Sequence, residues 1–184
     1  EQIVLDNELG KEYLEQLCDI DRTAFKLEPT PQALEWAEKH PWMYHILRRK
    51  NSVLGYTLVM PLRKSAYDAM KQGKIFEDEL RVRDIDSDNP EGLYLGSIAA
   101  SPKVRFNKQP FVTGILCGVL GGQLGRSSRE VIAIPFTKTG QKLAEMLQMR
   151  PIVSELNVSG IDGYSPAVFV KQPYERKTPL NIGN

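Results

Sequence analysis

A short basic segment is the first part of the sequence whose residue types suggest chemistry. It runs from Lys103 to Lys108 and is followed by Pro110, which we expect to open a long apolar helix. Unpaired backbone N–H groups at the start of a helix attract anions, and the helix dipole adds to that attraction. Arg105 and Lys108 would place positive charge beside these groups. The segment is therefore typical of a site for phosphate groups.

An acidic segment between two predicted elements is the second candidate. Asp84, Asp86 and Asp88 alternate along it, and Glu91 follows. The spacing lacks the central glycine and the terminal glutamate of a calcium-binding loop, so that interpretation is excluded. Two alternatives stay open, namely a solvated loop and the edge of a pocket for a cationic amine.

The cysteines and histidines do not predict a metal site. Cys18 and Cys117 lie far apart in apolar helical patterns, and His40 and His45 are the only histidines. No pair of cysteines flanks the histidines at the spacing that a zinc site needs. We expect two buried free thiols, which suits a reducing, cytoplasmic location.

The composition is that of an ordinary globular chain. It has 184 residues, of which 41% are hydrophobic, and 24 basic side chains against 23 acidic ones give a net charge of +1. This balance makes nucleic-acid binding an unfavoured function, since such domains usually carry a basic excess. No apolar run approaches the ~20 residues that span a bilayer. We expect a single domain over residues 1–184, which can be part of a longer protein.

The spacing of apolar residues, with the proline and glycine breaks, predicts alternating helices and strands. A strand, a helix and a second strand in the centre require a parallel crossover, whereas the hairpin requires antiparallel pairing. The fold class is therefore α+β, with a central mixed sheet and helices on both faces. The expected helices are Leu9–Phe25, Pro31–Lys39 after the N-cap Thr30, Ser65–Gln72, Pro110–Leu124 and a helix from the cap Thr137 to Leu147, and the expected strands are Met43–Arg49, Ser52–Leu62, Leu93–Ala100, Val131–Ile134, Ile152–Val158 and Ala167–Lys171.

Four local patterns, in this order and spacing, resemble the GNAT family, the Gcn5-related N-acyltransferases. Ile20–Phe25 resembles the end of the family's first helix, and Val53–Leu58 resembles a strand with a central Gly-Tyr pair. Leu95–Pro102 resembles the central strand and its exit, and Thr137–Ile152 resembles the last conserved helix and its turn. The resemblance covers the chain from Ile3 to Lys171 and implies a GNAT-like acyl-CoA N-acyltransferase fold.

The resemblance also implies a donor, an acceptor and the residues that bind them. The donor is acetyl-CoA or a longer acyl-CoA, without a metal, and the acceptor is a primary amine that attacks the thioester directly. The carboxylate or phenol that removes the amine's proton is assigned to Glu91 or Tyr94. The donor is expected between the central strand and Val131–Pro135. The residues implied in donor binding are Ser97, Ile98, Ala99 and Ala100 along the pantetheine arm, Arg105, Lys108, Gln109, Phe111 and Val112 at the phosphates, and Thr137.

The sequence departs from the family pattern at two places. Lys108 and Pro110 occupy positions where the family's phosphate loop has glycine, and Ala144 occupies the position of the tyrosine that usually acts as the general acid. These departures support an alternative hypothesis, in which the domain no longer transfers acyl groups and acts as a binding or regulatory module.

Two further features carry open alternatives. Gly114, Gly118, Gly121 and Gly122 weaken the long helix, so they indicate either close packing on the sheet or room for an acyl chain. The C-terminal strand pair leaves an edge that can pair with a second copy, and a homodimer is one expectation.

Overall fold

The fold is a single mixed β-sheet with helices on both faces. A computed structural model describes residues 2–26, 28–104, 108–124, 127–153, 156 and 165–173. Within these ranges the sheet has the strand order β1-β2-β3-β4-β5-β7-β6. The strands are β1 (Ile3–Asp6), β2 (Tyr44–Arg49), β3 (Ser52–Leu62), β4 (Gly92–Ala100), β5 (Glu130–Ala133), β6 (Arg150–Val153) and β7 (Val168–Lys171).

Among the strands that the structure describes, only one neighbouring pair runs parallel. The first four strands of the sheet pair antiparallel, β4 pairs parallel with β5, and β7 pairs antiparallel with both β5 and β6. The parallel pair needs a crossover, which contains α4 (Gln109–Leu124). The predicted α+β class with a mixed sheet is therefore confirmed.

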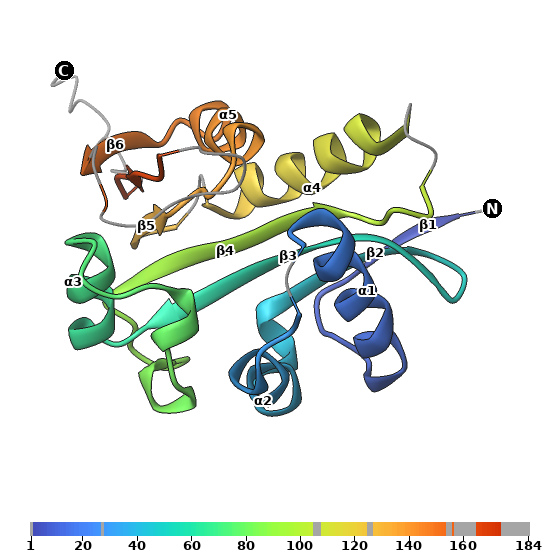
Figure 1. Cartoon of the computed structure of the whole chain (residues 1–184), viewed down its shortest axis with the longest axis horizontal. Coiled ribbons are helices and arrows are strands. Elements are labelled where there is room, and N and C mark those ends of the chain that lie inside the picture. The colour runs from blue at the N-terminus through green and yellow to red at the C-terminus, as the bar shows by residue number, and fades with distance from the viewer. Residues whose placement is uncertain are drawn as a thin grey trace, which may run out of the picture.

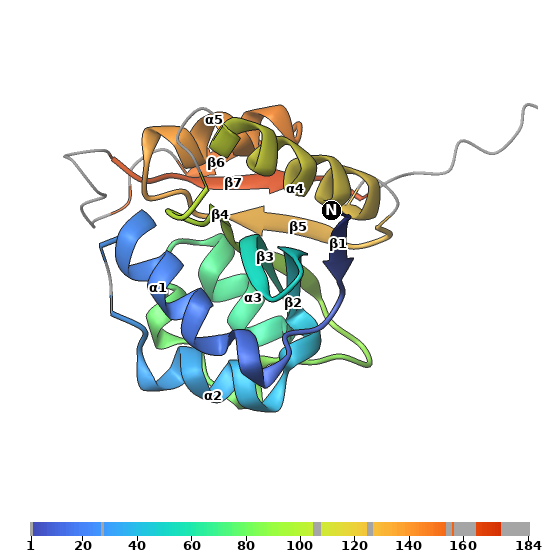
Figure 2. The ribbon, with the colours of Figure 1, turned by 90° about the vertical axis from the view of Figure 1, so that its right-hand side faces the viewer.

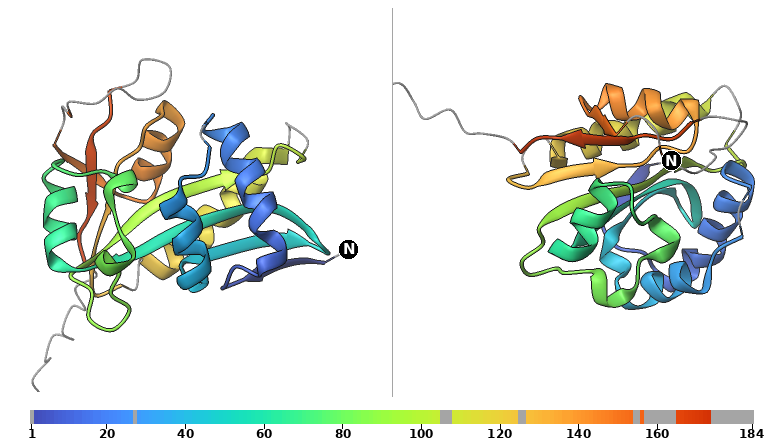
Figure 3. Two further views of the ribbon diagram at one scale, coloured as in Figure 1. Left: turned by 60° about the horizontal axis from the view of Figure 1, so that its bottom comes forward. Right: turned by 60° about the vertical axis from the view of Figure 1, so that its left-hand side comes forward.

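The helices form a layer on each side of the sheet (Figure 1). α4 and α5 (Lys138–Met146) cover one face, while α1 (Leu14–Ala24), α2 (Pro31–Lys39) and α3 (Lys64–Lys71) cover the other (Figure 2). We call these the α4 face and the α1 face, and the right-hand view of Figure 3 shows both layers with the sheet between them. Short 3-10 turns join the elements of the α1 face; they are η1 (Lys11–Tyr13), η2 (Pro41–Met43), η3 (Glu77–Glu79) and η4 (Val82–Asp84).

Two threonines begin helices as the sequence predicts. The hydroxyl of Thr30 accepts the backbone N–H of Ala33 at 3.1 Å, and the hydroxyl of Thr137 accepts that of Gly140 at 2.9 Å. Each bond satisfies one of the N–H groups that a helix start leaves unpaired. Both predicted caps are confirmed.

Gly55 on β3 brings α4 unusually close to the sheet. A Cβ atom at this position would lie 2.6 Å from the carbonyl oxygen of Ala99 and 2.9 Å from a methyl carbon of Val112. Val112 and Leu116 are buried between helix and sheet. A larger residue would push α4 outward, so this glycine fixes how the helix lies across β3 and β4.

Three differences from the predictions exceed one residue. The sequence analysis missed β1, because a four-residue strand with a polar end gives a weak alternating pattern; its Asp6 pairs with Arg48 of β2. The predicted helix Leu9–Phe25 begins with a 3-10 turn, and its α-helical part is α1. The strand predicted over Ile152–Val158 is observed over Arg150–Val153. Of the remaining predicted positions, residue 156 is outside any strand, and residues 154, 155, 157 and 158 lie outside the described residues.

β6 lies at the edge of the sheet. A homodimer through this edge stays a prediction. The described part of the chain contains no helix with the length and apolar character to cross a membrane.

Candidate functional site

The central strand of the sheet has a free edge over half its length. β4 pairs with β5 only from Gly92 to Leu95, where the two strands separate. At the same point the pairing with β3 shifts by one residue, so Gly96 forms a bulge opposite Leu58 and Val59. No strand in the described ranges pairs with Ser97–Ala100 on the β5 side. Backbone groups on this edge are therefore available to a ligand.

A cavity of about 1210 Å³ lies at the point where the strands separate. Its lining comes from both faces of the sheet and from the strand ends between them, so it passes through the sheet. From the α4 face the lining includes Gln109, Thr113, Gly114, Cys117, Lys138, Lys142 and Ala144. The strands and their ends contribute residues 94–100 and 133–136. The α1 face contributes Ala24, Phe25, Lys26 and Glu77.

A carboxyl group with a raised pKa reaches the cavity from the α1 face. Glu77 belongs to η3, and the phenol of Tyr94 on β4 donates a hydrogen bond of 2.9 Å to its Oε2. Burial raises the pKa of Glu77 to about 7, although the bond from Tyr94 acts in the opposite direction. The oxygen also lies 3.0 Å from the Cβ position of Gly96, which places it beside the bulge.

A second carboxyl–phenol pair lies next to the first on the same face. The buried phenol of Tyr56 donates a hydrogen bond to Asp21 of α1, and the side chain of Ser97 hydrogen-bonds the same phenol. Burial raises the pKa of Asp21 to about 6. The ring of Tyr44 lies 6.2 Å from that of Tyr56, and burial, followed by the charge of Glu77, raises the pKa of Tyr44. These groups connect α1 and β3 with the free edge of β4.

Comparisons with known proteins give matches in structure and none in sequence. Neither the protein-family models nor the curated protein sequences match the chain. Among solved structures, histone acetyltransferase HPA2 and related acetyltransferase from Corynebacterium glutamicum is 15% identical, with a TM-score of 0.59 over 97% of this chain and 100% of that one. A GNAT-family acetyltransferase from Bacillus cereus is 12% identical, with a TM-score of 0.55 over 94% and 99% of the two chains. This chain has the GNAT fold.

A third neighbour with the GNAT fold was solved with a ligand. It is Naa50 from Arabidopsis thaliana in complex with the bisubstrate analogue CoA-Ac-MVNAL, 10% identical, with a TM-score of 0.56 over 92% of this chain and 98% of that one. At these identities the neighbours establish the fold alone. The fold predicted from four short sequence patterns is thus confirmed over nearly the whole chain.

Most of the donor-binding residues expected from GNAT sequence patterns line the cavity. Ser97, Ile98, Ala99 and Ala100 form the free edge of β4, and Gln109 and Thr137 stand at the starts of α4 and α5. Of the other four expected residues, the three that the structure describes lie elsewhere. Lys108 is exposed just before α4, Phe111 is 62% exposed on the outside of that helix, Val112 is buried against Gly55, and Arg105 lies outside the described residues.

The glycines of α4 do not serve close packing. A Cβ atom at Gly114, Gly118 or Gly122 would meet nothing within 4 Å, and one at Gly121 would reach only Leu147 at 3.9 Å. The packing alternative is therefore wrong for these positions. Gly114 lines the cavity beside Cys117, so its missing side chain leaves space at the site itself.

Of the two residues expected to act on the amine, the structure brings only one to the cavity. Tyr94 lines it and is 1% exposed. Glu91 is exposed at the opposite end of β4, where its carboxylate lies 3.4 Å from the Nζ of Lys64, and it is not among the lining residues.

The sequence analysis did not identify Glu77, because this residue reaches the site from a turn between β3 and β4. One local signal could have indicated it. Ile75, Phe76 and Leu80 are apolar neighbours of Glu77 in the sequence and lie in or against the core, and the ring of Phe76 packs against that of Phe136, which lines the cavity. An acid in such a setting is a candidate for burial and a raised pKa.

Two lysines bring positive charge to the α4 face of the cavity. Lys138 and Lys142 both line it from α5, and neither forms a salt bridge within the described residues. In those same residues no group of three or more His, Cys, Asp and Glu side chains gathers as metal ligands do.

Proposed function

We propose that this chain is an acyl-CoA-dependent N-acyltransferase in which a primary amine attacks the thioester directly. The observation that carries the proposal is the cavity through the sheet, which joins the free edge of β4 to the Glu77–Tyr94 pair. A neighbour with the same fold was solved with an analogue that joins CoA to an acceptor peptide, which supports the same pairing of ligands here.

The α4 face fits the donor. The backbone groups of Ser97–Ala100 can hydrogen-bond the amides of the pantetheine arm, and the space left at Gly114 admits its chain. Lys138 and Lys142 supply charge for phosphate groups, and Gln109 stands where the first N–H groups of α4 are unpaired. A backbone N–H of β4 beside the bulge can polarise the thioester carbonyl as an oxyanion hole does. The volume of the cavity exceeds the ~300–1,000 Å³ of typical ligand pockets, which supports a ligand as large as acetyl-CoA or a longer acyl-CoA.

The α1 face fits the chemistry of the amine. An aliphatic amine is mostly protonated at neutral pH and must lose a proton before it attacks. Glu77, with a pKa of about 7, is partly ionised at that pH and can accept the proton directly or through water. The nitrogen then bonds to the carbonyl carbon, the carbon–sulfur bond breaks, and CoA leaves as a thiolate.

The departing thiolate has no tyrosine on α5 to protonate it, because Ala144 lines the cavity there. A thiol with a pKa near ~8.5 is a good leaving group, and water can supply its proton. The same alanine favours a second candidate function, a domain that binds acyl-CoA without transferring the acyl group. A cytoplasmic location and a homodimer belong to the proposal as expectations.

Calorimetric titration with acetyl-CoA and with a long-chain acyl-CoA tests the donor half of the proposal. We expect micromolar binding of at least one of them, and release of free thiol when an amine is added. Binding without thiol release for any amine would favour the binding-module candidate. Absence of binding for both donors at millimolar concentration would contradict both candidates.

A further inference from the structure

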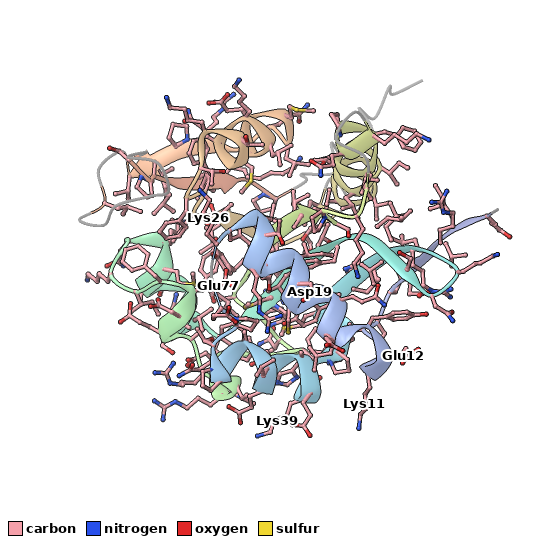
Figure 4. The ribbon with its side chains drawn as sticks, turned by 45° about the vertical axis from the view of Figure 1, so that its right-hand side comes forward. Lys11, Glu12, Asp19, Lys26, Lys39 and Glu77 are labelled. Carbon is pink, nitrogen blue, oxygen red and sulfur yellow. The ribbon has the colours of Figure 1, made fainter. Side chains whose placement is uncertain are left out.

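Lys26 is a cation at the cavity that neither donor binding nor proton removal uses. It follows Phe25 at the end of α1, and both residues line the cavity. Figure 4 shows Lys26 beyond the end of α1 and Glu77 on the turn below it. Both residues come from elements of the α1 face, so this half of the cavity carries one basic and one acidic side chain.

The backbone at Lys26 has an unusual conformation for its residue type. Its φ of 56° lies in the left-handed region, which glycine usually occupies at the end of a helix. A side chain there costs on the order of 1 kcal/mol. Such positions are a reason to ask whether the side chain itself has a function.

Within the described residues Lys26 has no counter-charge, unlike the basic residues of α1 and α2. Arg22 pairs with Asp19 and Glu28, and Lys39 pairs with Glu35. In the described part of the chain, no hydrogen bond or ion pair involves the ammonium of Lys26. A free ammonium at the rim of a cavity is available to an anionic group of a ligand.

We propose that Lys26 binds the carboxylate of the acceptor, so that the acceptor is an amino acid or a related small molecule with both an amine and a carboxylate. This inference rests on the proposed function. The amine lies against Glu77, where it loses its proton, and the carboxylate lies against Lys26. A cationic acceptor with no acid, such as a polyamine, would bring a second positive charge toward Lys26 and is disfavoured.

Matched pairs of acceptors, with and without the carboxylate, test this proposal. The probes are phenylalanine against 2-phenylethylamine, lysine against cadaverine, and arginine against agmatine. Thiol release is measured at saturating acetyl-CoA. We expect the acid-bearing member of at least one pair to have the higher kcat/KM by about tenfold or more, the range of a hydrogen bond between charged groups.

Two variants at Lys26 separate its charge from its backbone. Lys26→Gly keeps the left-handed conformation without strain and removes the charge, whereas Lys26→Arg keeps the charge. We expect the glycine variant to lose most of the preference for the acid-bearing acceptor, with the KM for acetyl-CoA unchanged, and the arginine variant to retain it. Lys142→Gln, on the α4 face, is the matched control and should alter only the affinity for acetyl-CoA.

Several results would overturn the inference. One is an equal or reversed preference in kcat/KM within every pair of acceptors. Another is a loss of kcat/KM in Lys26→Gly that is the same for both members of a pair. A third is a Lys26→Gly effect confined to the KM for acetyl-CoA, which would assign Lys26 to the donor. If acetyl-CoA binds but no probe reacts, calorimetric titration of the protein–CoA complex with each probe measures whether the acid-bearing probes bind. Failure of every acid-bearing probe to bind would then overturn the inference and leave the donor site standing, whereas failure of acetyl-CoA itself to bind would contradict the proposed function.

Discussion

The two sides of the cavity are built from different kinds of groups. On the α4 face the lining is made of backbone edges, small residues such as Gly114 and Cys117, and two lysines that have no acidic partner among the described residues. On the α1 face the lining includes the ammonium of Lys26 and the carboxyl group of Glu77, which accepts a hydrogen bond from the phenol of Tyr94. A long, polar ligand such as CoA can be held largely by the backbone, but proton transfer requires titratable side chains. We therefore expect donor binding to depend on the α4 face and proton transfer to depend on the α1 face, and substitutions should separate the two.

The largest expected effect is the loss of the base. Glu77→Gln keeps an oxygen that can accept the hydrogen bond of Tyr94 but cannot take up a proton. We expect kcat to fall by about 10²- to 10⁴-fold, the usual contribution of a general base, while the affinity for acetyl-CoA stays the same. Steady-state kinetics and calorimetry on the same preparation measure both.

Glu91→Gln is the matched control for the loss of the base. It removes a carboxylate of the same size that lies on the surface beside Lys64, and we expect near-normal turnover. A larger loss for Glu91→Gln than for Glu77→Gln would reverse our assignment of the base.

The next effect belongs to the α4 face. Gly114→Leu places a bulky side chain in the space beside the free edge of β4, so we expect acetyl-CoA to bind at least about tenfold more weakly. Gly118→Leu, one helical turn further on at an exposed position outside the cavity lining, should leave binding unchanged. Equal affinities for the two variants would show that the donor does not lie along α4.

A smaller effect concerns the pKa of the base. The hydrogen bond from Tyr94 lowers the pKa of Glu77, so Tyr94→Phe should raise that pKa further. Because the base acts when ionised, the rise in rate with pH should move to higher pH, by about one unit or less. A shift to lower pH would contradict the assignment. Rate profiles of the two proteins between pH 5 and pH 9 measure the shift.

The smallest effects come from the two helix caps. Thr30→Ala and Thr137→Ala should each lower the free energy of unfolding by about 1 kcal/mol, because each removes one capping hydrogen bond. Only Thr137 lines the cavity, so only its variant should also weaken the binding of acetyl-CoA. Denaturant unfolding and calorimetry provide the two readouts, and an equal loss of affinity in both variants would mean that the α1 and α4 faces are not independent.

The sequence predicts those parts of the fold that depend on local patterns. Thr30 and Thr137 mark helix starts, and the apolar run of β4 marks the centre of the sheet. β1 is not predicted, because four residues give too short an alternation of apolar and polar side chains, and its pairing with β2 depends on the rest of the sheet.

The residues of the site likewise fall into those that could be predicted from the sequence and those that could not. The resemblance to the GNAT family implies a free edge on the central strand, and Ser97–Ala100 have such an edge in the structure. The position of Glu77 could not be predicted, because it depends on how a turn folds against Tyr94 of β4. The apolar residues beside Glu77 in the sequence indicate burial but not the strand that it contacts. Glu91 precedes β4 and lies near its first residues, whereas the strands separate only after Leu95.

The most direct test of this account is the pH dependence of thiol release at saturating acetyl-CoA, with the best acceptor from the matched pairs. We predict that the rate of the wild-type protein rises as pH increases through about 7, as Glu77 loses its proton. This rise should disappear in Glu77→Gln, together with most of the rate, and persist in Glu91→Gln. A Glu77→Gln variant that keeps both the rate and the rise near pH 7 would contradict the central claim that Glu77 is the base.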